Sequence, residues 1–218
     1  INLSVQQIES KKNFCNKIWN AANYILSHEQ PKASYSSESL SIADEWIITK
    51  LHNLVESSHR HYAEHRLDLL TKDLYDFVWH DFCDWYIEVS KITMKSDHVD
   101  QTKKAAVYHT LRTVLESALK LLHPIIPFIT EDLYQKLTKK EKFVSIMESG
   151  YPRLDIDAKT NESVNTFEFI KEVVSCLRQC RSENKVAPKA QLNASIAFAS
   201  KSSIDVFSNY NELICSLA

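Results

Sequence analysis

The sequence predicts a mainly α protein: an antiparallel helical bundle over residues 1–150, followed by a small α+β segment over residues 151–218. Gly150 is the only glycine in 218 residues, and there are five prolines. A fold rich in sheet usually needs more glycine in its turns. Apolar residues recur at helical spacing in one segment after another, and a hydrophobic content of 44% supplies a normal core.

Seven segments have this helical spacing. They are residues 8–26, 42–65, 74–94, 101–122, 129–137, 162–183 and 204–218. Ser41 followed by Asp44 has the spacing of a capping box and marks the start of the second segment. Pro124 and Pro127 end the fourth segment, because proline cannot occupy a helix interior. Short connections between such helices favour an antiparallel bundle.

The segment 74–94 is expected to bury one side. Its apolar residues fall within an arc of about 120°, with Asp81, Asp84 and Glu88 opposite. Acidic residues spaced by three and four on such a face are typical of a solvated surface. The large aromatic residues of this helix and of the first are expected in the core. These are Trp19, Trp79, Phe82 and Trp85.

The composition changes after Tyr151. Leu192, Ala194, Ile196 and Phe198 alternate with smaller or polar residues, and this alternation predicts a strand over residues 192–198. The last helical segment is still amphipathic where the sequence stops, so we expect a longer parent protein.

Composition also excludes several function classes. With one glycine, the chain has neither a dinucleotide-binding GxGxxG turn, nor a GxxxxGK[ST] phosphate loop, nor a GxSxG nucleophile elbow. The five cysteines are odd in number and lack CxxC spacing, so we expect reduced thiols without a disulfide or structural zinc. No apolar run is long enough for a membrane span, and we expect a cytoplasmic protein. A net charge of −2 gives no general attraction to DNA, so nucleic-acid binding needs a local patch.

The first helix has two chemically different sides. Asn13, Asn16, Asn20 and Asn23 fall within about 80° of one another at 100° per residue, and Lys17 and Tyr24 extend this arc by about 40°. Asparagine is a poor helix former. A row of amides opposite an apolar face therefore indicates a surface kept for a polar partner.

The motif HYAEH, residues 61–65, formally has the HxxEH pattern of inverted zinc peptidases. It lies at the polar end of a helix, without a companion acidic motif downstream. Cys176 and Cys180 are four residues apart, but two thiols without further ligands rarely form a zinc site. We therefore expect no metal site and no catalytic residue, and the zinc hydrolase is kept as an alternative.

Several stretches resemble one family. NFCNKIWNA, ADEWI, FVWHDFCDWYIEVSK, LLHPIIPFITEDLYQ, SIMESGYPR and LRQCRSENKVAPKAQL are similar to successive landmarks of the C-terminal region of the valyl-tRNA synthetases. The resemblance covers nearly the whole chain. It implies that residues 1–150 are a class I anticodon-binding helical bundle whose partner is the anticodon stem-loop of valine tRNA, and that the chain is a monomer.

The resemblance also implies what this chain lacks. The parent enzymes attach valine to its tRNA by means of ATP and Mg²⁺, in a Rossmann domain with HIGH-like and KMSKS-like signatures that are not found here. We therefore expect no cofactor and no catalysis in this chain. The alternatives are the same domain from an isoleucine, leucine or methionine enzyme, or a helical protein-interaction bundle without an RNA role.

The candidate tRNA-binding residues follow from the amide row and from this resemblance. Amides offer donors and acceptors to base edges, Tyr24 is suited to stack on an unpaired base, and lysines hold phosphates. The first-helix candidates are Lys11, Lys12, Asn13, Asn16, Lys17, Asn20, Asn23 and Tyr24. A second basic group near the end of a later helix consists of Arg178, Arg181 and Lys185.

Overall fold

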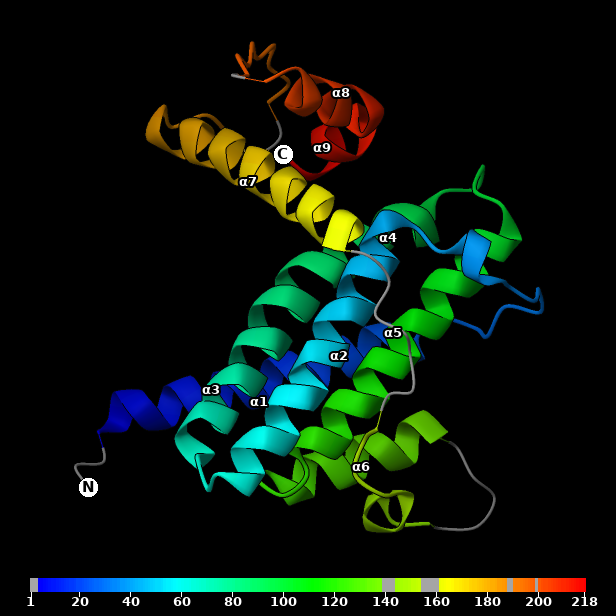
Figure 1. The fold of residues 1–218 in the computed structure, drawn as a ribbon, viewed down its shortest axis with the longest axis vertical. Helices are drawn as coiled ribbons and strands as arrows, with labels where there is room; N and C mark the ends of the chain where they lie inside the picture. Colours follow the sequence, from blue (N-terminus) through cyan, green and yellow to red (C-terminus); the bar gives the residue numbers. More distant parts are fainter. Residues whose placement is uncertain (1–3, 139–143, 154–160, 188–189, 199) are drawn as a thin grey trace. The chain divides into compact units, whose positions relative to one another are not determined.

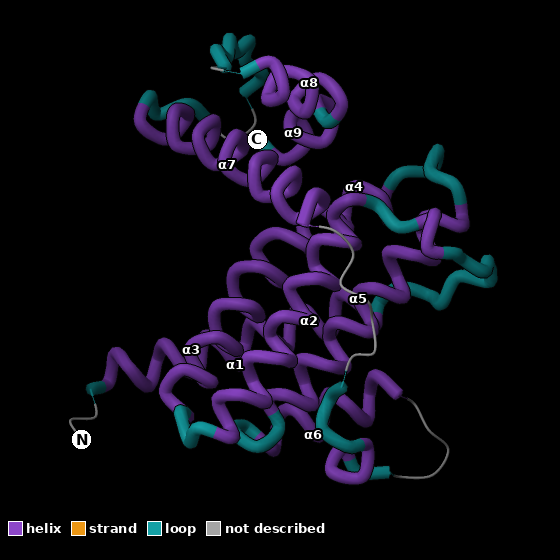
Figure 2. The backbone as a smooth tube through the Cα atoms, viewed as in Figure 1, coloured by secondary structure: helices purple, strands orange, loops and turns teal. Residues whose placement is uncertain are grey.

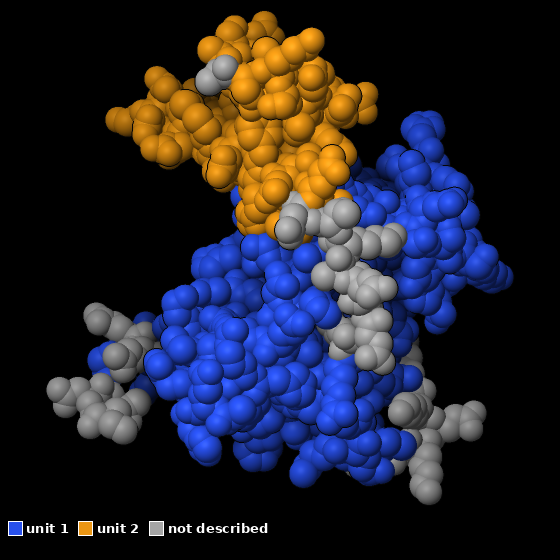
Figure 3. Space-filling view, in the orientation of Figure 1, with its two compact units in different colours: residues 1–159 blue, residues 160–218 orange. Residues whose placement is uncertain are grey.

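The structure is a computed structural model that describes residues 4–138, 144–153, 161–187, 190–198 and 200–218. Its contacts divide the chain into two compact units, Ile1–Lys159 and Thr160–Ala218 (Figure 3), and each is described by itself. The domains expected from the sequence, 1–150 and 151–218, stay a prediction about the organisation of the parent protein.

The first unit is a helical bundle. Its long elements are α1 (Val5–Leu26), α2 (Ile42–Ala63), α3 (Leu67–Asp76), a π-helix (Phe77–Tyr86), α4 (Ile87–Lys95), α5 (Gln101–Leu122) and α6 (Pro127–Thr138). Two short 3₁₀ helices, Ser37–Ser39 and Ile146–Ser149, lie in the connections. α2 packs against α3, the π-helix and α5, and α1 crosses these helices to contact the π-helix, α5 and α6 (Figure 1). The expected mainly α bundle is confirmed.

The apolar side of α1 fixes that helix in the bundle. Phe14, Ile18, Ala21 and Ile25 are all buried, as their helical spacing predicts. α2 contributes Trp46, which is fully buried. No described helix is long and apolar enough to span a membrane.

The start of α2 is the capping box that the sequence predicts. The Asp44 carboxylate accepts hydrogen bonds from the Ser41 backbone N–H and hydroxyl at 2.7 Å each, while the Asp44 N–H donates to Ser41 Oγ at 3.2 Å. The other carboxylate oxygen of Asp44 accepts a hydrogen bond from the Tyr86 hydroxyl. Asp44 is 1% exposed, and burial raises its pKa. The cap therefore also ties α2 to the π-helix.

The helix over residues 67–95 contains a π-helix, which the sequence did not predict. At its end the N–H of Ile87 donates to the carbonyl of Phe82, five residues earlier. In a π-helix, residues five apart share a face. Phe77 and Phe82 are accordingly both buried, as are Val78 and Cys83.

This register corrects the expected solvated acidic face. Asp84 forms an ion pair with Lys17 of α1, and Asp81 lies 3.8 Å from Lys50 of α2. Glu88, in α4, is exposed as expected, and its carboxylate accepts a hydrogen bond from Lys91 Nζ at 2.6 Å. The expectation failed because it assumed 100° per residue through a segment that turns more slowly.

The aromatic core is also smaller than expected. Phe82 is buried, but Trp79 and Trp85 are half-buried. Trp19 is 36% exposed. In the register of the π-helix the Trp79 ring lies at the edge of α1, where it contacts Lys17.

The second unit consists of α7 (Asn161–Glu183), α8 (Lys201–Asn209) and α9 (Asn211–Leu217). α9 packs on α7, and Phe167 and Ile170 of α7 and Ile214 of α9 are fully buried. The strand expected over residues 192–198 is not formed: residues 190–198 have no regular secondary structure, and the described part of the chain shows no strand (Figure 2). A strand needs a partner for its backbone hydrogen bonds, and alternation alone does not supply one.

Candidate nucleic-acid interface

The amide row of α1 faces away from the bundle. Asn13, Asn16, Asn20 and Asn23 are all exposed, while the opposite side of the helix is buried. One exposed helix face therefore presents four side chains, each with two N–H donors and a carbonyl acceptor. We call these four residues the asparagine row.

Tyr24 lies beside the asparagine row and is half-buried. Its hydroxyl is 3.2 Å from Ser90 Oγ of α4, its ring meets the edge of His28 at 4.8 Å between centroids, and Lys91 Nζ lies 5.8 Å from the ring centroid. Burial raises the pKa of Tyr24. The Tyr24 side chain is thus held in place by these contacts, and its hydroxyl stays protonated at physiological pH.

Lys17 borders the row next to Tyr24 and is engaged within the bundle. Its ammonium pairs with the Asp84 carboxylate and lies 3.9 Å from the centroid of the Trp79 ring. Lys11 and Lys12 are exposed, and Lys11 Nζ is 5.7 Å from the Tyr75 ring centroid. Lys11 and Lys12 are therefore open to solvent, whereas Lys17 is held by its contacts with Asp84 and Trp79.

Trp19 borders the opposite side of the row, about 40° from Asn23 around the helix. Lys136 of α6 lies 4.0 Å from the centroid of its ring. The sequence reasoning placed Trp19 in the core because it is apolar. Its angular position beside Lys12 and Asn23 was the signal that it lies at the boundary instead.

Residues 44–196 match the sequence model of a family described as the anticodon-binding domain of tRNA ligase. The chain belongs to this family. The matched residues begin at Asp44, so the asparagine row lies before the matched segment, whereas the π-helix and its Asp84 lie within it.

Three relatives are valine–tRNA ligases. The chain is 39% identical to that of Legionella pneumophila (strain Lens) over 193 residues, which is 86% of this chain and 21% of the relative. It is 37% identical over 197 residues to that of Xanthomonas axonopodis pv. citri and 35% identical over 195 residues to that of Francisella tularensis subsp. tularensis, in both cases 88% of this chain and 21% of the relative. The resemblance to the valine enzymes is confirmed. The chain spans about a fifth of the length of these relatives.

The second basic group of this anticodon-binding domain is largely engaged with backbone carbonyls. Arg178 donates from Nε to the carbonyl of Leu217 at 2.9 Å. Arg181 donates from Nη2 to the carbonyls of Ala187 and Ala190 at 3.1 and 3.0 Å. Lys185 is exposed and has a φ of 53°. Both arginines therefore hold the second unit together, and an RNA contact by this group stays a prediction.

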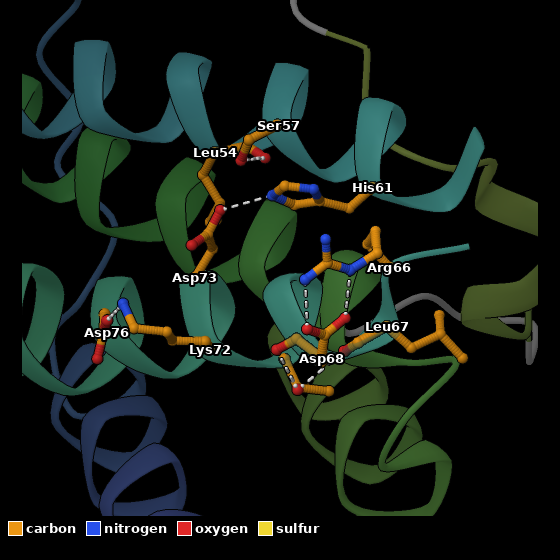
Figure 4. Close-up of polar contacts among 10 residues, drawn as sticks. Leu54, Ser57, His61, Arg66, Leu67, Asp68, Lys72, Asp73 and Asp76 are labelled. Atoms are coloured by element: carbon orange, nitrogen blue, oxygen red, sulfur yellow. Dashed lines mark hydrogen bonds and ion pairs between the residues drawn. The ribbon is translucent and has the colours of Figure 1, made fainter. Parts of the chain in front are cut away.

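The HYAEH segment takes part in the packing of α2 on α3. His61 is 6% exposed, and its Nε2 lies 3.0 Å from an Asp73 carboxylate oxygen, with the two side chains pointing at one another in Figure 4. His65 follows the end of α2 with a φ of 57°. Within the described ranges no three His, Cys, Asp or Glu side chains gather in an arrangement that could hold a metal ion. The geometry gives His61 a structural partner.

Proposed function

We propose that this chain recognises the anticodon of valine tRNA through the exposed side of α1. The observation that carries the proposal is the asparagine row, four exposed amides on one helix face. A helix gains no stability from such a row. Unpaired loop bases are what proteins read in RNA, by hydrogen bonds to their edges and by stacking. The family match and the valine–tRNA ligase relatives support the same function.

The residues that border the row supply the other two elements of loop recognition. The Tyr24 ring, held by Ser90 and His28, offers a surface on which a base stacks. Lys11 and Lys12 are exposed on the N-terminal half of α1 and suit the phosphates of the stem, which fix the register without specifying sequence. We expect base readout at the row and phosphate contact beyond it.

The parent protein, on this proposal, is a valine–tRNA ligase. We expect catalysis, with ATP and Mg²⁺, in a part of the parent protein outside this chain, which spans 21% of the Legionella relative. The chain itself supplies recognition only. We propose further that the domain is monomeric and acts in the cytoplasm, where charged tRNA is used.

The proposal is tested by titrating the chain with valine tRNA and with the same tRNA altered only in its anticodon. We expect tighter binding of the unaltered tRNA, with a ratio of affinities that persists as salt is raised. Phosphate contacts alone would give equal affinities for the two tRNAs, both falling with salt. That result would contradict anticodon recognition, and absence of binding would favour a protein-interaction bundle.

A further inference from the structure

The π-helix brings Trp79 and Asp84 to one side, and both contact Lys17. The two residues are five apart, so in an α-helix they would point about 140° away from one another. In the π-helix they share a face. Lys17 lies against the Trp79 ring at 3.9 Å and pairs with Asp84. The unusual backbone register is what allows one ammonium to meet both side chains.

The charge of Lys17 is balanced where it lies. The Lys17 and Asp84 side chains are 22% and 43% exposed, so solvent screens this pair less than a fully exposed one. His80 Nδ1 lies 3.3 Å from the other Asp84 oxygen. Burial, partly offset by the nearby Lys17, raises the pKa of the Cys83 thiol to about 12, so Cys83 adds no charge. Lys17 and Asp84 are thus the charged pair that borders the asparagine row at this point.

We propose that Trp79 and Asp84 are positioning residues that hold Lys17 beside the asparagine row, so that Lys17 serves discrimination between anticodons and not general attraction to phosphate. The inference rests on the proposed function. A balanced ion pair releases few counterions on binding RNA, whereas each free lysine that neutralises a phosphate steepens the salt dependence. An ammonium has three N–H donors, so a held Lys17 keeps donors for an acceptor on a loop base.

The test is Asp84→Asn in the full chain, with binding of the two tRNAs measured across a salt series. Freed from its partner, Lys17 becomes a mobile cation. We expect the slope of log affinity against log salt to steepen by about 0.7. The ratio of affinities between the two tRNAs should fall by about tenfold, as when one hydrogen bond to a charged group is lost. In the double variant Asp84→Asn/Lys17→Ala the extra slope should disappear.

Asp81→Asn is the matched control, because it removes the same charge from the same π-helix. Asp81 lies near Lys50 of α2 instead of Lys17, so we expect the wild-type slope and ratio. Trp79→Leu keeps the ion pair, and we expect it to lower the ratio without changing the slope.

Two results would overturn the inference. Asp84→Asn could lower the melting temperature yet leave slope and ratio unchanged, which would make Asp84 a structural residue only. If Asp81→Asn changed the salt slope and the ratio of affinities as much as Asp84→Asn does, the effect would come from net charge in general. If the wild-type chain does not discriminate between the tRNAs, the proposed function fails instead, and this outcome is visible before any variant is made.

Discussion

Replacing Asp44 with alanine is expected to lower the free energy of unfolding by about 3 kcal/mol. The change removes the acceptor of the Ser41 N–H at the start of α2, a hydrogen bond worth about 0.5–1.5 kcal/mol. It also leaves the hydroxyl of Tyr86, which is 1% exposed, without this acceptor, at a cost of about 1–3 kcal/mol. Urea unfolding at pH 7, followed by circular dichroism, measures the loss.

Two further variants separate the parts of this effect. Tyr86→Phe removes only the hydroxyl and should cost about 1 kcal/mol, while Asp44→Asn keeps one acceptor and should fall between the two. A loss in Asp44→Ala no larger than that in Tyr86→Phe would contradict the cap as a link between α2 and the π-helix.

The same carboxyl sets a pH dependence. Burial raises the pKa of Asp44 in the folded chain, so the native state holds this proton more tightly than the unfolded chain does. The stability that this proton adds is fully present below the pKa of Asp44 in the unfolded chain, about 3.9. It is lost as the pH rises through the pKa of Asp44 in the folded chain. Wild type should therefore gain stability relative to Asp44→Asn as the pH falls from 7 toward 4.

Replacing Tyr24 with leucine is expected to weaken binding of the valine anticodon stem-loop by about tenfold or more, since stacking of a base on an aromatic ring is worth about 1–3 kcal/mol. Leucine fills much of the half-buried site, so the fold should remain. Affinities by fluorescence anisotropy and melting temperatures of the same samples measure the two effects separately.

Tyr24→Phe is the control for the ring. It keeps the stacking surface and loses only the bond to Ser90, so its affinity should stay near wild type. Wild-type affinity in Tyr24→Leu would contradict stacking. A drop in melting temperature as large as that of Trp46→Ala, a fully buried residue, would place Tyr24 among the core residues instead.

The two sides of α1 could be predicted from sequence because they depend only on a local period. Ile18 and Ile25 are buried and Asn16 and Asn20 exposed, as 100° per residue requires. The capping box at Ser41 was visible for the same reason, since its partners are three residues apart.

The wrong predictions concern features that depend on backbone geometry and on distant partners, which a local sequence pattern does not contain. A π-helix changes the angle between residues without an evident change in composition, so Trp79 and Asp84 were assigned to opposite faces. The partner of Asp84 is 67 residues away in the sequence. Residues 192–198 have the alternation of a strand but no partner strand in the described chain. Arg181 looked like a free cation because the carbonyls that it meets leave no mark in the sequence.

Base readout by the asparagine row is tested by following its side-chain amides by NMR while the anticodon stem-loop is added. Asn53 of α2 and Asn211 of α9, also exposed, serve as internal references. We predict that the signals of Asn13, Asn16, Asn20 and Asn23 shift with the valine stem-loop and shift much less with an altered anticodon, while both reference signals stay still. Unmoved signals from the row while the stem-loop binds elsewhere would contradict base readout by the row.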